Sequence, residues 1–167
     1  ITQSSIRFIE ACLPLGIAGI YFAVQLATYD LLSEAEYHEF GEPYDRRVLA
    51  AAESCWFNMV HLHGLDVMFD LVAQYPAHAL NWHARETPPT LAGGHARFPG
   101  AICGGLAQWD DLLRGDPDLV RREIADAVAQ TGGERLIIAS GCVSPVNTPW
   151  SNPSAVREAV EGIGSRA

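Results

Sequence analysis

Short apolar segments alternate with amphipathic segments along the whole chain. The apolar runs are bounded by Gly, Pro or polar clusters, which is the pattern of buried strands. Between them, apolar residues recur at helical spacing. We expect strands at 17–23, 56–63, 77–82, 101–104 and 135–140. We expect helices at 2–13, 33–54, 66–74, 90–96 and 118–130, and a last helix from Ser154.

Capping signals place several of the helix ends. Ser33 is followed three residues later by Glu36, which predicts a capping box at a helix start. Asp116-Pro117 predicts an N-cap with proline in the first turn, and Gly132-Gly133 predicts the end of the same helix. Regular alternation of strands and helices indicates an α/β fold, with a parallel sheet covered by helices.

Polar and glycine residues follow the predicted strands more often than they precede them. In parallel α/β folds, ligands bind at the carboxyl ends of the strands. We therefore expect a functional site at this end of the sheet. The residues that fall there are His61, His63, Asn81, His83, Gly104, Gly105 and Cys142.

Two imidazoles and one thiol among these residues suit a metal ion. His61 and His63 are two positions apart in an extended segment, so their side chains point to the same side. With the thiolate of Cys142 they form a three-ligand set that zinc accepts, leaving a fourth position for substrate or water. The alternatives are two polar residues bonded to backbone or water at a strand end, and a small buried cysteine beside a glycine.

The other polar residues at the strand ends are candidates for proton transfer and substrate binding. His83 and Glu86 can supply or accept a proton, and Arg85 can bind a carboxylate. A solvated surface salt bridge is the other interpretation of the same residues. Gly104-Gly105 lets backbone amides approach an anion, or forms a plain tight turn. The predicted catalytic residues are His83 and Glu86, and the predicted substrate-binding residues are Asn81, Arg85, Gly104 and Gly105.

Composition narrows the class of protein. The 167 residues are 49% hydrophobic and 19% charged, which suits one globular domain with a core. Eleven basic residues, all of them Arg, stand against 20 acidic ones, for a net charge of −9. That balance argues against nucleic acid as a partner. No apolar run approaches the length of a membrane span. The four cysteines show no tight pairing pattern, so we expect reduced thiols in a cytoplasmic protein.

Taken together, several motifs in this chain resemble the uroporphyrinogen decarboxylase superfamily. This superfamily includes the heme-pathway decarboxylases and the zinc methyltransferases that move a methyl group from a corrinoid protein to coenzyme M. The order and spacing of the motifs fit from about Ile1 to the end of the chain. The motifs are Leu31-Leu32-Ser33-Glu34 through Pro43-Tyr44, Val60-His61-Leu62-His63-Gly64, Ala79-Leu80-Asn81-Trp82, Gly104-Gly105-Leu106, and Ser140-Gly141-Cys142 through Thr148-Pro149.

For the fold, the resemblance implies a (β/α)₈ barrel of TIM type. The chain would be the C-terminal part of one such domain over residues 1–167, with about five βα units corresponding to strands four to eight. Five strands do not close an eight-stranded barrel, and two sheet edges are left over. We therefore expect either a longer chain or a second copy in a homo-oligomer.

For the function, the resemblance implies alternatives. In the corrinoid methyltransferases, a His-x-Cys after the fifth strand and a Cys after the eighth hold zinc. The matching positions here are His61, His63 and Cys142, with an imidazole in place of one sulfur. The leading hypothesis is zinc-dependent methyl transfer on a small thiol or methylated substrate, with a corrinoid-bound methyl donor.

A metal-free decarboxylase (a carboxy-lyase of porphyrin biosynthesis) is the second hypothesis. It needs several arginines in the cleft, and Arg85 and Arg97 are the candidates. A non-catalytic binding module derived from the barrel is the third hypothesis.

Overall fold

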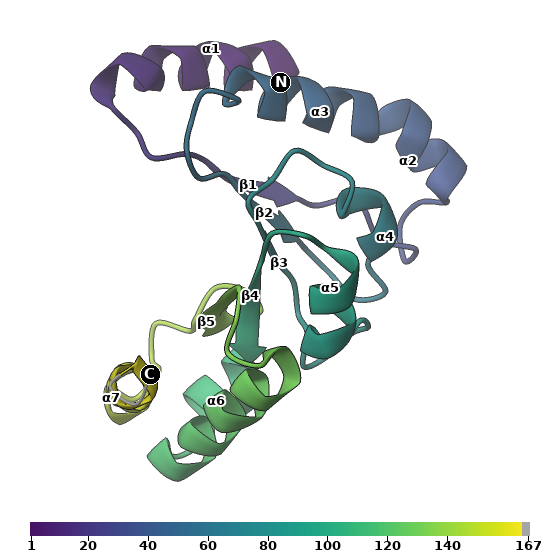
Figure 1. Ribbon diagram of the computed structural model, residues 1–167. Helices are drawn as coiled ribbons and strands as arrows, with labels where there is room; N and C mark the ends of the chain where they lie inside the picture. The colour runs from purple at the N-terminus through teal and green to yellow at the C-terminus, as the bar shows by residue number, and fades with distance from the viewer. Residues whose placement is uncertain (165–167) are drawn as a thin grey trace. The chain divides into compact units, whose positions relative to one another are not determined.

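The computed structural model describes residues 1–164 as an α/β fold with one five-stranded sheet (Figure 1). The strands follow one another in chain order across the sheet. They are β1 (Tyr21–Val24), β2 (Met59–Leu62), β3 (Ala79–Asn81), β4 (Ala101–Leu106) and β5 (Leu136–Ser140). The pairs β1–β2 and β4–β5 are parallel, so the predicted class and strand direction are confirmed.

Helical segments separate the strands along the chain. They are α1 (Thr2–Cys12), η1 (Leu13–Leu15), α2 (Glu34–Phe40), α3 (Glu42–Ala51), α4 (Phe69–Val72), α5 (Leu91–Arg97), the π-helix η2 (Gln108–Leu113), α6 (Pro117–Thr131) and α7 (Ser151–Gly164). The chain divides into two compact units, one of residues 1–80 and one from Asn81 onward. No helix within residues 1–164 combines the length and the apolar character that crossing a bilayer requires.

In the first unit, α1 lies alongside α3, and the two helices bury an apolar cluster with the segment that leads into β1 (Figure 1). The cluster consists of Ile9, Val48, Ala52 and Cys55, flanked by Ile6, Leu13, Ile17, Ile20, Phe22 and Ala51. The strand expected from residue 17 begins only at Tyr21. Before Tyr21, the carbonyls of Ala18 and Ile20 still accept the N–H groups of Phe57 and Met59, at 3.0 and 2.9 Å. The N–H of Ile20, however, donates to the side-chain oxygen of Asn58 at 3.1 Å.

The second predicted strand is also shorter than expected. It was expected from Trp56, but β2 begins at Met59 and ends at Leu62, so His63 follows the strand. Trp56 is 74% exposed, which shows that its apolar side chain is not part of the strand core. Apolar character alone does not separate a buried strand from an exposed approach segment.

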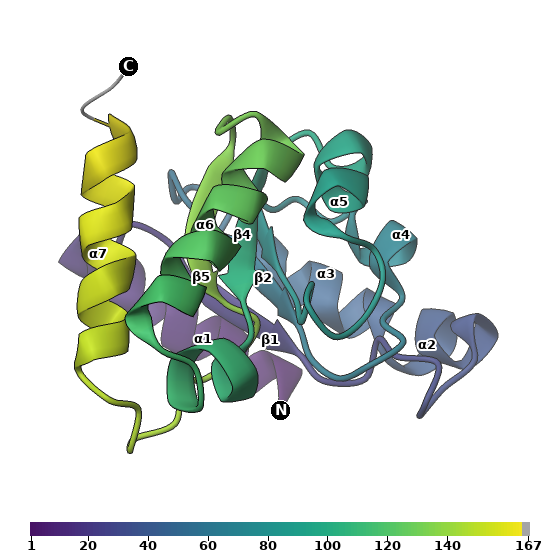
Figure 2. The same cartoon turned by 90° about the horizontal axis from the view of Figure 1, so that it is seen from below.

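In the second unit, α6 and α7 pack together over an apolar cluster that includes Leu106, Leu112, Val120, Ile124 and Ala155 (Figure 2). The register of β4 and β5 runs from Ile102 opposite Leu136 to Leu106 opposite Ser140. The last helix was expected from Ser154 but begins at Ser151, with Pro153 in its first turn. Proline is tolerated there because the first N–H groups of a helix have no partner within the helix.

Gly104 and Gly105 lie inside β4, so the expectation of a turn after a strand ending near residue 104 is corrected. They pair with Ile138 and Ala139 of β5. Gly105 has φ +110, and a Cβ there would lie 2.9 Å from the Cβ of Ala127 in α6. The glycine therefore allows α6 to approach the sheet closely.

The predicted caps are confirmed. Ser33 and Glu36 form a reciprocal capping box at the start of α2. The Asp116 side chain accepts the N–H of Leu119 at 2.8 Å, and Gly132 ends α6 in the left-handed conformation. The π-helix η2 has no signal in the apolar pattern and was not predicted.

Gly105→Ala should lower the free energy of unfolding by about 1–3 kcal/mol, since the left-handed backbone and the close contact with Ala127 both oppose a Cβ. Gly162→Ala is the matched control in α7. A Cβ added there would meet no atom within 4 Å, so this variant should be neutral or stabilise by about 0.5–1 kcal/mol. Urea unfolding curves measure both, and equal midpoints for the two variants would contradict the packing assigned to Gly105.

Candidate metal centre

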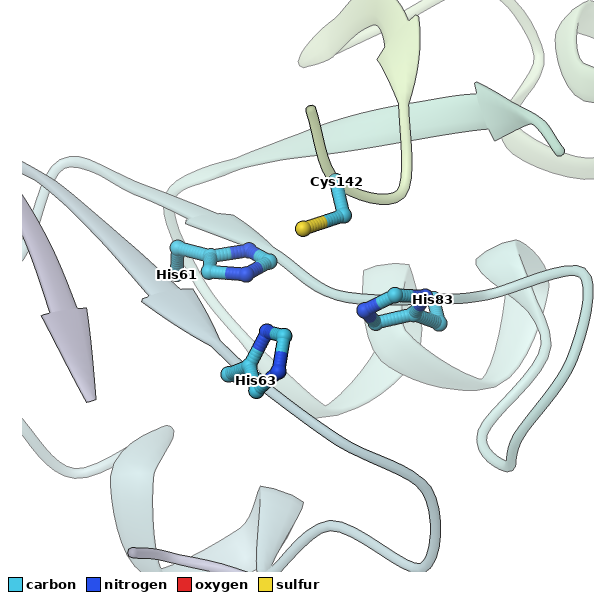
Figure 3. A group of neighbouring side chains, drawn as sticks. All are labelled: His61, His63, His83 and Cys142. Carbon is cyan, nitrogen blue, oxygen red and sulfur yellow. The ribbon is translucent and has the colours of Figure 1, made fainter. Parts of the chain in front are cut away.

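His61 and His63 lie together at the end of β2, as the strand spacing predicted. Their ring centroids are 5.7 Å apart (Figure 3). His61 is 3% exposed, and its ring stacks on Tyr21 of β1 at 5.9 Å between centroids. The N–H of His63 donates to the carbonyl of Val24 at 3.0 Å, so pairing with β1 continues past the end of β2. Both imidazoles are therefore held by the strand pair.

Cys142 and His83 belong to the second unit, and the packing of their backbones brings their two loops together. Gly141 is buried, and a Cβ on it would lie 2.7 Å from the Cα of His83. The N–H of Gly141 donates to the carbonyl of Leu106 at 3.1 Å, and the Ser140 hydroxyl donates to the carbonyl of Cys142. The loop that follows β5 is thus fixed against the loop that follows β3.

His83 starts a tight turn that also holds Glu86. The backbone N–H groups of Glu86 and Thr87 both donate to the carbonyl of His83, at 2.7 and 2.9 Å. The His83 side chain is 7% exposed and that of Glu86 is 35% exposed. Nδ1 of His83 lies 3.8 Å from Oε2 of Glu86, which is longer than a hydrogen bond. The carboxylate therefore faces one nitrogen of a buried imidazole.

Asn81, predicted to bind substrate, is tied to the sheet. Its buried amide nitrogen donates to the carbonyl of Cys103 at 2.9 Å and to that of Ser140 at 3.1 Å. Both N–H bonds of the side chain are thus directed at the backbone of β4 and β5. This geometry favours a role in positioning the strand ends over contact with a ligand.

Arg85, also predicted to bind substrate, is directed at α6. Nε donates to the carbonyl of Gly105 at 2.9 Å, and Nη1 contacts Asp126 at 2.6 Å. Nη2 contacts both the carboxylate and the carbonyl of Glu123 at 2.9 Å. The hydrogen bond from Arg85 lowers the pKa of Asp126. The guanidinium thus joins the β3 loop to α6 rather than presenting a free binding surface.

The π-helix η2 adds polar residues that the sequence pattern did not single out. Trp109, Asp110 and Arg114 line a shallow hollow of about 410 Å³ together with Glu86. Asp111 of the same helix accepts the N–H of Ala107 at 2.7 Å, and burial raises the pKa of its carboxyl group. π-helical turns are frequent at functional sites, but they are not visible in apolar periodicity.

Comparisons with known protein families and solved structures identify the family and the fold of this chain. The model of the uroporphyrinogen decarboxylase (URO-D) family matches residues 1–163. A solved methyltransferase from Methanosarcina mazei is similar in structure, with a TM-score of 0.84 and 20% sequence identity. The alignment covers 98% of this chain and 47% of the methyltransferase, so the chain spans about half the length of that protein. No curated protein matches the sequence. The likeness shows a fold of the TIM-barrel type with five of its βα units.

Arg85→Met should lower the free energy of unfolding at pH 7 by about 1–3 kcal/mol, because several charge-assisted hydrogen bonds are lost. Arg85 lowers the pKa of Asp126 in the folded protein below its value in the unfolded chain. The stabilisation by this ion pair is therefore complete above the pKa of the unfolded chain, and it is lost as the pH falls through the lower pKa of the folded protein. The difference between variant and wild type should therefore shrink below about pH 4. Unfolding curves at pH 7 and pH 3 measure it, and a constant difference would contradict the ion pair.

Proposed function

This chain belongs to the uroporphyrinogen decarboxylase family, and we propose that it forms the C-terminal part of one barrel domain of a zinc-dependent enzyme. The enzyme would act on a small thiol or methylated substrate by methyl transfer. His61, His63 and Cys142 would hold the metal ion. A corrinoid-bound methyl group is the proposed donor, and the four free thiols suit a cytoplasmic protein.

The observation that carries the proposal is the placement of imidazole and thiol donors at the carboxyl ends of strands in each unit. In the first unit, the ring centroids of His61 and His63 lie 5.7 Å apart (Figure 3). In the second unit, Gly141 packs the loop of Cys142 against the backbone of His83. Imidazole nitrogen and thiolate sulfur are donors that zinc prefers, so these residues fit the ion in kind.

A bound zinc ion would keep a coordinated thiol deprotonated, and therefore nucleophilic, at neutral pH. The residues of this chain that hold the ion would determine how acidic the metal is and how nucleophilic the bound thiolate is. Neutral imidazoles in place of thiolates leave more net positive charge at the site, which favours Lewis acidity. Burial of His61 and its stacking on Tyr21 fix the plane of that ring. A fixed ring orientation is what a ligand histidine needs.

The proposed partners follow from the two terminal strands of the sheet and from exposed apolar side chains. Tyr21 of β1 is 60% exposed, and β1 and β5 each lie at one end of the strand order. Three further strands, from a longer chain or from a second copy, would complete the barrel. In the loop after β5, Val143, Val146 and Trp150 are exposed. Exposed apolar side chains of this kind suit contact with a protein, and we propose the corrinoid protein as that partner.

Decarboxylation of a tetrapyrrole has less support from the described residues. That reaction needs arginines that face the substrate carboxylates. Arg85 is engaged with Glu123 and Asp126 of α6. Arg97 closes α5 just before β4 begins, which is the amino end of that strand. Neither residue is therefore a free cation at the carboxyl ends of the strands.

Metal analysis of the purified protein tests the proposal. The wild type should contain about one equivalent of zinc, while His61→Ala and Cys142→Ser should lose most of it, since each removes one of few ligands. His38→Ala is the control, because it removes an exposed imidazole that pairs with Glu42 in the first unit. Methyl transfer from methylcobalamin to small thiols should fall in parallel with the zinc content.

Two outcomes would end the proposal. One is a folded wild type that neither contains zinc nor takes it up. The other is equal metal content in wild type and His61→Ala. Conversion of uroporphyrinogen to coproporphyrinogen by the metal-free protein would establish the decarboxylase. Absence of both activities in a metal-free protein would indicate a binding module.

A further inference from the structure

We infer that a hollow between the turn after β3 and the π-helix η2 binds a small organic cation that carries N-methyl groups. The hollow is lined by Glu86 of the turn, by Trp109 and Asp110 of the π-helix, and by Arg114 at the end of that helix. All four residues belong to the second unit, so the site needs no residue of the first unit. The inference goes beyond the proposed metal centre and assigns a separate binding site by the chemical class of its ligand.

One wall of the hollow is fixed through Arg85, the residue that precedes Glu86. The Nε atom of Arg85 donates to the carbonyl of Gly105 in β4 at 2.9 Å, and its Nη1 atom contacts Asp126 of α6 at 2.6 Å. The N–H of Glu86 itself donates to the carbonyl of His83 at 2.7 Å. The backbone that carries the Glu86 carboxylate is therefore anchored to β4 and α6.

The other wall is fixed at both ends of the π-helix. At its start, a side-chain oxygen of Asp111 accepts the N–H of Ala107 at 2.7 Å. At its end, the buried side-chain nitrogen of Asn152 in α7 donates to the carbonyls of Leu112 and Gly115, both at 2.9 Å. A site whose walls are held in place before binding loses less entropy when a ligand enters.

The charges that line the hollow favour a cation. Glu86 and Asp110 provide two carboxylates, whereas Arg114 provides one guanidinium. The Nη1 atom of Arg114 lies 2.8 Å from Oδ1 of Asp110, so these two charges balance each other. The carboxylate of Glu86 is 35% exposed and lies 3.8 Å from Nδ1 of His83, which is longer than a hydrogen bond. The lining is therefore negative as a whole, which disfavours a phosphate or a sulfonate.

The indole of Trp109 favours a cation with apolar substituents. Its side chain is 47% exposed, so part of the ring is open to a ligand. The face of an indole attracts cations, and quaternary ammonium ions are the ligands that proteins most often recognise in this way. N-methyl groups add apolar surface that can contact the ring while the positive charge is drawn to Glu86. The volume of the hollow, about 410 Å³, lies within the range of about 300–1,000 Å³ that is usual for small-molecule sites.

Choline is the probe that tests the site, titrated against the intact protein without added metal and followed by saturation-transfer NMR of its methyl signal. The wild type should bind choline saturably. It should bind 3,3-dimethylbutan-1-ol, the uncharged carbon isostere of choline, at least about 10-fold more weakly, because the isostere has the same shape without the charge. Propane-1-sulfonate, an anion, should not compete. Equal affinities for choline and its isostere would overturn the inference.

Two substitutions of Trp109 separate the aromatic face from apolar bulk. Trp109→Phe should keep the Kd for choline within about 3-fold of the wild type, whereas Trp109→Leu should raise it about 10-fold, because leucine has no aromatic face. Trp150→Leu is the matched control, since Trp150 is 84% exposed just before α7 and does not line the hollow. A Kd in Trp109→Leu equal to that of the wild type would also overturn the inference.

Substitutions of the charged residues test the sign of the ligand. Glu86→Gln should raise the Kd for choline about 10-fold, and Glu161→Gln, which changes an exposed carboxylate of α7, should leave it unchanged. Arg114→Met should lower the Kd about 3-fold, because it removes a like charge and releases Asp110. A higher Kd in Arg114→Met, or propanesulfonate binding that this variant abolishes, would show a site for anions instead.

The result is distinguishable from the outcome for the metal centre. Saturable choline binding by a wild type that takes up no zinc would support this site although the proposed function fails. A folded, zinc-containing wild type that does not bind choline saturably would overturn this inference and leave the metal centre intact.

Discussion

The side-chain amide of Asn81 fixes the strand ends on which the site of the second unit depends. Its nitrogen donates to the carbonyls of Cys103 in β4 and Ser140 in β5; the first bond is buried and the second is partly buried. An unpaired amide in that position would cost about 1–3 kcal/mol, so the arrangement is strongly preferred over a displaced one. Cys142 lies two residues beyond Ser140, and its position follows from this anchoring. A residue that touches no ligand thus helps to decide where the thiol can be.

Much of the fold was predictable because it rests on local rules. The alternation of strands and helices, the capping box at Ser33, and the ends of α6 at Asp116 and Gly132 each follow from neighbouring residues. The convergence of His61 and His63 was predictable for the same reason, because a strand turns every second side chain to one side. Placing His83 beside Cys142 required more. It depends on a contact between loops 58 residues apart in sequence, and only the missing side chain of Gly141 hints at it.

The expectations that the structure revised concern interactions that sequence spacing does not encode. For Arg85, the sequence left substrate binding and a surface salt bridge both open, and two carboxylates about 40 residues further along the chain hold its guanidinium. Gly105 was expected to end a strand, but its lack of a Cβ serves the packing of α6. In both cases the residue type was a sound indication of an unusual environment. What the sequence could not supply was the partner, because the partner is brought near only by the fold.

One fold can support more than one reaction, so the choice between decarboxylation and thiol activation has to rest on the residues at the strand ends. A decarboxylase that binds a polycarboxylate needs positive charge directed at the substrate, and Arg85 directs its charge at α6. A thiol-activating enzyme needs soft donors and a small number of uncharged nitrogens, and the strand ends carry one thiol and three imidazoles. With one thiolate and a divalent ion, the centre would keep a net charge of about +1. That charge attracts a second thiolate, from a substrate, more strongly than a centre already neutralised by two protein thiolates. In the proposed centre, an imidazole from His63 in place of a second thiolate would therefore favour capture of a thiol substrate, at some cost in the nucleophilicity of the bound sulfur.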